Sequence, residues 1–258
     1  MTPALALGIS LAVALAAWRA RAVTRNGAAA ATLVGLAILW STGWPGAAVL
    51  AAFFVPSTLV GRLGARRPGA SDARGEQRDA IQVLANGGAA ALGACAECFT
   101  PGLGFWILTA ALAAAAADTW ATGLGAFSRR NPRHLLSRAP VPRGTSGGVS
   151  LVGTLGGLAG ALLVAGAAAA TRSDSALLGE GIALGMAGMG FDSLLGAACQ
   201  ARFRCPVCGS GSERRVHRCG TRTQLVGGWR WLDNDGVNAL ATTAAGLAGA
   251  LWFRISLG

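Results

Sequence analysis

Residues 140–160, PVPRGTSGGVSLVGTLGGLAG, join a short basic loop rich in glycine, serine and threonine to an apolar stretch. This order predicts a membrane helix whose first turn faces water. The first N–H groups of a helix lack partners within it and lie at the positive end of its dipole, so they suit a phosphate group. The residues expected to hold that phosphate are Thr145, Ser146, Gly147, Gly148 and Ser150, with the charge of Arg143 beside them.

The same stretch also fits a structural role that needs no ligand. Small residues let two helices approach closely in a bilayer. Gly156, Gly157 and Gly160 are small residues of this kind within the apolar stretch. Both interpretations remain open from this stretch alone.

The composition predicts an all-α, polytopic membrane helix bundle. Of 258 residues, 53% are hydrophobic and only 13% are charged, and the apolar runs recur too often for a soluble core. A span needs about 20 apolar residues. About eight candidates occur, at 3–18, 27–41, 45–61, 80–98, 103–127, 148–170, 177–200 and 236–253. We expect one integral domain, 1–258, with a cytoplasmic loop at 201–234 inserted between the last two helices.

The arginines predict the orientation. All 22 basic residues are arginine, and 20 of them fall in the loops after the first, third, fifth and seventh expected spans. By the positive-inside tendency these loops are cytoplasmic, so both termini of this cell-membrane protein face outward. The charge indicates topology and anionic headgroups, and it makes nucleic acid a poor candidate partner.

Polar residues interrupt the apolar runs in the cytoplasmic half of the span. Asp118 and Asp192 each lie inside a run, and an isolated Asp at a helix centre costs about 2.5–3.5 kcal/mol on insertion scales. Two other runs carry polar residues at i, i+3 and i+7, which share one helix face. These are Asp79, Gln82 and Asn86 in one run, and Asp235, Asn238 and Thr242 in the other.

Two interpretations explain these groups. They could hydrogen-bond to one another inside the bundle, or they could line a hydrated cavity that holds a divalent cation and phosphates. The second explains more, because carboxylates hold Mg²⁺ while arginines and a glycine-rich helix start hold phosphate.

The loop at 201–234 contains a metal-ligand pattern. Cys205 and Cys208 are separated by two residues, and His217 and Cys219 by one. Three thiolates and one imidazole form a tetrahedral zinc set with no open position, which favours a structural role. The second pair has one intervening residue where two are usual, so a loop with free cysteines is the alternative.

The chain resembles the domain-of-unknown-function 92 membrane family, which includes plant phytyl-phosphate kinase and animal transmembrane protein 19. Five segments carry the resemblance, in this order: QRDAIQVLANGG, ADTWATGLG, VPRGTSGGVSLVGTLGGLAGA, FDSLLGAACQ and WLDNDGVNAL. The likeness as a whole extends over nearly the whole chain. One departure concerns Gly123, which stands where the family usually has Glu.

The resemblance implies phosphoryl transfer from a nucleoside triphosphate, with CTP as one candidate, to a polyprenyl monophosphate such as phytyl phosphate. We expect Mg²⁺ at Asp118, Asp192 and Asp235. Arg143 and Arg78 would neutralise the transferred charge, and Gln82, Asn86 and Asn238 would position the acceptor or the metal shell. If the nucleophile is already a phosphate oxygen, positioning and charge neutralisation suffice without a strong base.

Two rival functions remain. The protein could be a transporter or flippase for an anionic lipid or a cation, although we find no internal repeat and the polar faces lie on one side of the membrane. It could also be a lipid-binding scaffold whose zinc loop recruits a partner.

Overall fold

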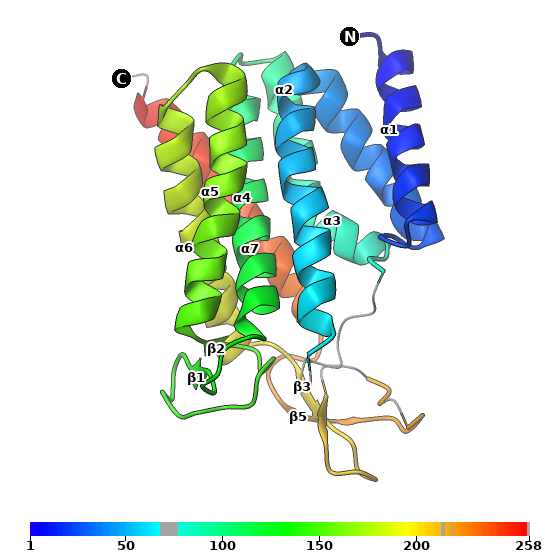
Figure 1. Cartoon of the computed structure of the whole chain (residues 1–258), viewed down its shortest axis with the longest axis vertical. Coiled ribbons are helices and arrows are strands. Elements are labelled where there is room, and N and C mark those ends of the chain that lie inside the picture. Colours follow the sequence, from blue (N-terminus) through cyan, green and yellow to red (C-terminus); the bar gives the residue numbers. More distant parts are fainter. Residues whose placement is uncertain (68–76, 213–214, 218, 257–258) are drawn as a thin grey trace.

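The computed structural model describes residues 1–67, 77–212, 215–217 and 219–256, which form a helix bundle with small β-sheets at one end (Figure 1). Its helices are α1 (Pro3–Arg19), α2 (Arg25–Ala65), α3 (Ala80–Ala94), the 3₁₀ helix η1 (Cys95–Cys98), α4 (Leu103–Gly125), α5 (Leu151–Arg172), α6 (Ala176–Ala198) and α7 (Asn234–Ser256). The predicted fold class, an all-α membrane bundle, is confirmed. Arg74, Arg214 and Arg218, which belong to the expected basic loops, lie outside the described residues.

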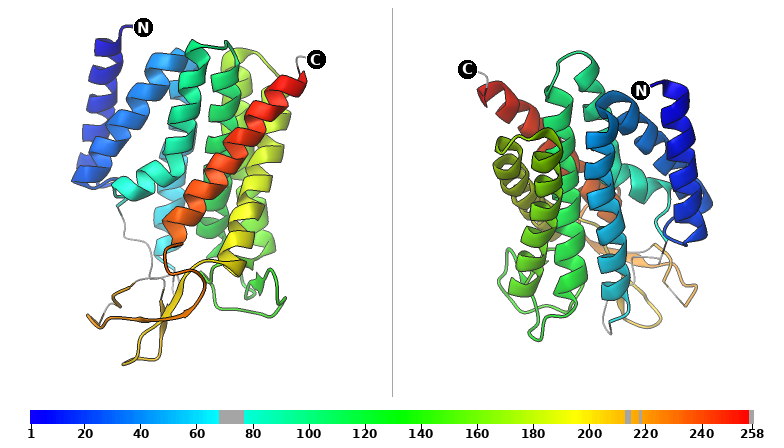
Figure 2. Two further views of the ribbon diagram at one scale, coloured as in Figure 1. Left: turned by 180° about the vertical axis from the view of Figure 1, so that it is seen from behind. Right: turned by 45° about the horizontal axis from the view of Figure 1, so that its top comes forward.

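The helices match the expected spans in place but not in number. Five of the described helices, α2, α4, α5, α6 and α7, are long and apolar enough to cross a membrane, whereas α1 and α3 have 17 and 15 residues. The expected spans 27–41 and 45–61 both lie in α2. Its backbone leaves helical geometry only at Gly43 (φ 66°, ψ −156°), just before Pro45. The two halves of α2 therefore run in different directions without a separate loop (Figures 1 and 2).

The bundle has two different ends. Both termini lie at one end, and the loops between α4 and α5 and between α6 and α7 lie at the other with the β-strands (Figure 1). This arrangement separates the termini from the two long arginine-rich loops.

Helix α4 is the centre of the bundle and contacts α2, α3, α5, α6 and α7. Every residue from 110 to 117 is buried, and all but Leu112 are alanine. Such small side chains allow close helix approach. A Cβ atom added at Gly160 of α5 would lie 2.8 Å from the Ala116 carbonyl oxygen, and one at Gly157 would lie 3.1 Å from the Ala117 carbonyl oxygen. These α5 glycines therefore lie at a close contact with α4, which is what the close-packing interpretation expects of them.

The loop before α5 corrects one expectation. Strand β2 (Gly148–Val149) pairs antiparallel with β1 (Arg133–His134), and the Ser150 hydroxyl caps α5 by accepting from the Gly153 N–H at 3.1 Å. The helix therefore begins at Leu151, not at 148. Thr145, Ser146 and Gly147 lie in a loop with turns and Gly148 lies in a strand, all before the helix, because pairing with β1 holds Gly148 and Val149 extended.

The second sheet belongs to the loop between α6 and α7. Its order is β4 (Gly211–Ser212), β3 (Arg202–Arg204) and β5 (Gln224–Gly227), all antiparallel. Phe203 of β3 is buried while the arginines on either side of it are exposed. The sheet thus faces the protein with one side and water with the other.

Candidate functional site

A cavity of about 590 Å³ lies at the loop end of the bundle. The loop at 201–234 that carries Cys205, Cys208, His217 and Cys219 is called the Cys/His loop. Every residue assigned from the sequence outside this loop lines the cavity: Arg78, Gln82, Asn86, Asp118, Arg143, Thr145, Ser146, Gly147, Gly148, Ser150, Asp192, Asp235 and Asn238. The structure thus brings together side chains from α3, α4, α6, α7 and the loop before α5. The roles assigned to them stay predictions.

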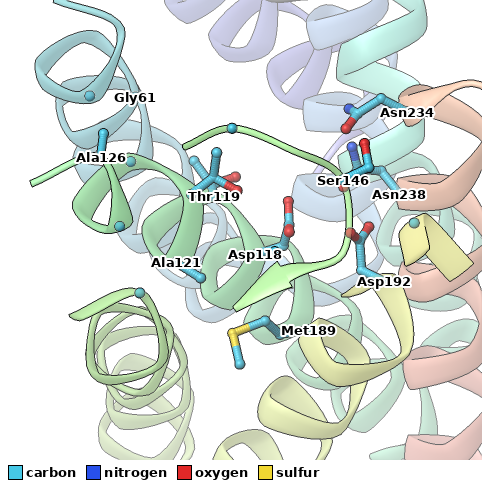
Figure 3. Close-up of a pocket in the computed structure, with 18 of the residues that line it drawn as sticks. Gly61, Asp118, Thr119, Ala121, Ala126, Ser146, Met189, Asp192, Asn234 and Asn238 are labelled. Carbon is cyan, nitrogen blue, oxygen red and sulfur yellow. The ribbon is translucent and has the colours of Figure 1, made fainter. Parts of the chain in front are cut away.

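Three carboxylates reach the cavity from three helices. Asp118 comes from α4, Asp192 from α6 and Asp235 from the first turn of α7, and all three are half-buried. In Figure 3 the carboxyl groups of Asp118 and Asp192 point into the same space as the amide of Asn238, which is buried. Carboxylate and amide oxygens are the ligands that Mg²⁺ takes, so this donor set fits that ion.

Four arginines line the cavity, two of them not assigned from the sequence. Arg62 donates to the Ala20 carbonyl at 2.8 Å, and the Arg67 guanidinium lies 4.2 Å from the centre of the Phe127 ring. The Arg78 guanidinium lies over the rings of Phe53 and Phe54, at 5.6 and 5.8 Å. Aromatic faces favour a cation, so the rings help to hold these side chains in place.

Local hydrogen bonds fix the start of α3 beside the cavity. Asp79 and Gln82 form a capping box, in which each side chain accepts from the other residue's N–H, at 3.0 and 3.2 Å. The neighbouring Arg78 donates its N–H to Ala22 and accepts from the Thr24 N–H, both at 3.0 Å. Gln82 therefore caps its helix as well as lining the cavity, so its oxygen is already engaged.

Two glycines shape the loop 143–150. Gly144 and Gly147 have φ of 78° and 74°, a region that side chains disfavour. A Cβ atom on Gly147 would lie 2.4 Å from the Ala197 Cβ and 2.6 Å from its Cα. The loop thus packs directly against the end of α6.

Two buried donors in the cavity wall have no acceptor in the described part of the chain. They are Nε of Arg143 and Nε2 of Gln200. Gln200 follows α6 and is 3% exposed. It is the last residue of the segment FDSLLGAACQ, but it was not assigned a role from the sequence because it lies beyond the polar face of the helix.

The Cys/His cluster lies outside this cavity. The Sγ atoms of Cys205, Cys208 and Cys219 lie 3.5–3.6 Å apart, and His217 Nδ1 lies 3.1 Å from the Cys219 Sγ and 3.4 Å from the Cys208 Sγ. A tetrahedral zinc ion with Zn–S of about 2.3 Å would give S–S edges of about 3.8 Å. The cluster could therefore hold a metal ion, and its dimensions fit zinc.

In each half of the cluster, a glycine N–H donates to the carbonyl of the first ligand of the pair. The Gly209 N–H donates to the Cys205 carbonyl at 2.9 Å, and the Gly220 N–H donates to the His217 carbonyl at 2.9 Å. Both glycines have positive φ, of 68° and 81°. A glycine with positive φ thus follows each ligand pair, and the unusual spacing of the second pair does not prevent this.

The cluster also changes the acidity of its thiols. Hydrogen bonds with the Thr221 side chain and then with His217 lower the pKa of Cys219 to about 5. Hydrogen bonds with Cys205 and Cys219 raise the pKa of Cys208 to about 12. Without a cation, Cys219 is therefore the thiolate and Cys208 keeps its proton, which a bound metal must displace.

Comparison with known proteins places the chain among membrane proteins. It is 29% identical to an uncharacterized membrane protein of Methanocaldococcus jannaschii, over 93% of this chain and 89% of that protein. It is 29% identical to Protein PGR of Arabidopsis thaliana, over 89% of this chain and 88% of that protein. It is 31% identical to an uncharacterized membrane protein of Synechocystis, over 82% of this chain and 75% of that protein. No solved structure matches the chain.

The sequence pattern described as "Integral membrane protein DUF92" matches residues 8–246, which is most of the chain. The match includes the loop 143–150, the carboxylates of α4, α6 and α7, and the Cys/His cluster. The protein therefore belongs to the DUF92 family of integral membrane proteins.

Proposed function

We propose that this protein transfers a phosphoryl group from a nucleoside triphosphate to a polyprenyl monophosphate such as phytyl phosphate, forming the diphosphate. One observation carries the proposal: three carboxylates, four arginines and a glycine-rich loop line a single cavity at one end of a membrane bundle. Binding of both a cation and anions requires groups of both signs in one place. The family resemblance implies the same reaction.

The donor side of the proposal uses the carboxylates and the loop. Asp118, Asp192 and Asp235 would hold Mg²⁺, which when bound neutralises charge on the donor phosphates. Ser146 and the backbone around Gly147 would contact those phosphates, with Arg143 beside them. The short contact of Gly147 with Ala197 keeps this loop in place against α6.

The acceptor side uses α3 and the remaining arginines. Arg78 and Asn86 would hold the acceptor phosphate, with Arg62 and Arg67 adding positive charge, and the prenyl tail would lie between helices. An oxygen of the acceptor monophosphate attacks the γ-phosphorus, and the bond to the β–γ bridging oxygen breaks. The nucleoside diphosphate leaves. A phosphate oxygen is already ionised near neutral pH, so the reaction needs no histidine base.

The Cys/His cluster would hold a structural zinc ion through Cys205, Cys208, His217 and Cys219. Four protein ligands leave no position for a substrate. The ion would therefore fold the loop between α6 and α7 and take no part in transfer.

The test incubates the purified protein with Mg²⁺, prenyl monophosphates and each of the four common nucleoside triphosphates. Mass spectrometry would detect the prenyl diphosphate. We expect Asp118→Asn and Asp192→Asn to abolish its formation while the proteins remain folded. Asp174→Asn, at the exposed turn before α6, is the matched control and should retain activity. Full activity in both cavity variants would reject the proposal.

Two further measurements separate the rival functions. Uptake of labelled prenyl phosphate into proteoliposomes without nucleotide would favour transport. Deletion of residues 205–219 tests the scaffold function, since surviving transfer would limit that loop to stability or docking.

A further inference from the structure

Gln200 Nε2 and Arg143 Nε are hydrogen-bond donors without an acceptor among the described residues, which indicates an acceptor outside the chain. Both atoms are buried, and both residues line the cavity from different elements, the end of α6 and the loop before α5. Buried donors in proteins are almost always paired, and leaving one unpaired costs about 1–3 kcal/mol. Two such donors in one cavity wall therefore indicate an acceptor that is supplied by a ligand.

The charge of Arg143 indicates the kind of acceptor. A guanidinium and a neutral amide together suit an oxygen with negative charge, and charge-assisted hydrogen bonds are about twice as strong as neutral ones. The glycine-rich turn at Gly144 and Gly147 adjoins Arg143. These features fit a phosphate oxygen.

The backbone around Gln200 is held by the segment that follows the Cys/His cluster. Gln200 pairs with Trp229 in a parallel bridge, and the Trp229 N–H donates to the Cys199 carbonyl at 2.8 Å. The Ala201 N–H donates to the Leu232 carbonyl at 2.8 Å, and Leu232 is fully buried. A Cβ atom on Gly228 would lie 2.0 Å from the Gln200 carbonyl oxygen, so glycine is required for this contact.

The same segment connects the cluster to the cavity. Strand β3 leads from Gln200 to Cys205, and β5 returns beside β3 to Trp229 before α7 brings Asp235 into the cavity. The two ends of the Cys/His loop are thus joined at Gln200. Folding of the loop around a metal would fix the position of Gln200.

We propose that Gln200 is a binding residue for a phosphate group in the cavity, acting with Arg143, and that the Cys/His loop positions it. The inference rests on the proposed function only in that the cavity binds a phosphate-bearing ligand. It does not depend on whether transfer occurs.

The test measures binding of inorganic pyrophosphate with Mg²⁺ to the full-length protein in nanodiscs. Gln200→Leu should weaken binding about tenfold, because it removes a hydrogen bond to a charged group. Gln200→Glu should weaken it further, since a carboxylate faces the anion. Gln224→Leu, on the exposed strand β5, is the control and should bind as the wild type does.

A chelation arm tests the positioning. Removal of zinc from the Cys/His loop, with Mg²⁺ kept in the buffer, should weaken pyrophosphate binding in the wild type. The same removal should have little additional effect in Gln200→Leu. Equal loss in both proteins would overturn the link to the loop. Wild-type binding in folded Gln200→Glu, or no binding by the wild type, would overturn the binding role. Pyrophosphate binding without diphosphate formation would reject the proposed transfer reaction and leave this inference standing.

Discussion

Glu180 shows how one residue can oppose the stability of the bundle. It lies in α6, is fully buried, and neither carboxyl oxygen has a hydrogen-bond partner within the described ranges. A Cβ atom added at Gly249 of α7 would lie 2.9 Å from its Oε1. Glu180 is thus enclosed between helices without a polar neighbour bonded to it. Burial of an unpaired polar group is unfavourable.

We expect Glu180→Met to stabilise the protein. Met has similar length and no unpaired oxygen, so the variant avoids a desolvation cost of about 1–3 kcal/mol and should melt about 2–8 °C higher. Thermal unfolding in detergent measures this. Glu97→Met is the matched control, and it should lower the melting temperature. Glu97 accepts from the Phe105 N–H at 3.1 Å and pairs with Arg172 at 3.3 Å, and the substitution removes both contacts. A lower melting temperature in Glu180→Met would contradict the prediction.

At the scale of elements, the crossing of α2 and α4 depends on two glycines. A Cβ atom on Gly64 would lie 2.7 Å from the Gly123 Cα, and one on Gly123 would lie 2.6 Å from the Val60 Cγ1 and 2.9 Å from its carbonyl oxygen. The family resemblance implies Glu at the position of Gly123. In this chain the position is a helix contact, with no room for a side chain.

We therefore expect Gly123→Ala to destabilise the protein. The added methyl group meets backbone atoms that cannot rotate away, and overpacking of this kind costs about 1–3 kcal/mol. Gly166→Ala on α5 is the control, because nothing lies within 4 Å of its added Cβ. The melting temperature should fall only in the first variant. Equal melting temperatures for the two variants would contradict the close crossing.

The Cys/His loop gives a second prediction at this scale. Elemental analysis of the purified protein should find about one zinc per chain, and Cys208→Ser should lose most of it, since removal of a thiolate leaves three ligands. Cys98→Ser, an exposed cysteine of η1 outside the cluster, should retain the metal. Zinc content unaffected by Cys208→Ser would reject the site.

The sequence predicted the cavity residues best where polar groups interrupt apolar helices. Asp118 and Asp192 are conspicuous because a charge in a membrane helix needs a reason. The same rule applies to Glu180, which also interrupts an apolar run and was overlooked. Arg62, Arg67 and Gln200 were not assigned, because they lie at helix ends where arginine and glutamine are ordinary. The late start of α5 depends on pairing with β1, a contact between residues about 15 apart that helical periodicity does not report.

At the scale of the whole molecule, the fold allows a test of orientation. Cys98 lies in η1, which precedes α4 at the end away from the cavity, whereas Cys208 lies in the loop beyond α6. Both are exposed. If the arginine-rich loops are cytoplasmic, a membrane-impermeant thiol reagent applied to intact cells should label Cys98 and should not reach Cys208.

Mass spectrometry of the labelled peptides would measure this. Permeabilised cells provide the control, in which Cys208 should also react unless zinc protects it. Labelling of Cys208 in intact cells, without labelling of Cys98, would reverse the orientation.

The position of α7 after the other helices that line the cavity has a consequence for biosynthesis. Asp235 and Asn238 complete the cavity wall that Asp118 and Asp192 begin, and α7 also packs against α3, α4 and α6. A nascent chain that ends before α7 therefore leaves the polar faces of the earlier helices without their last neighbour. Premature termination should then yield a product that quality-control proteases recognise in the membrane.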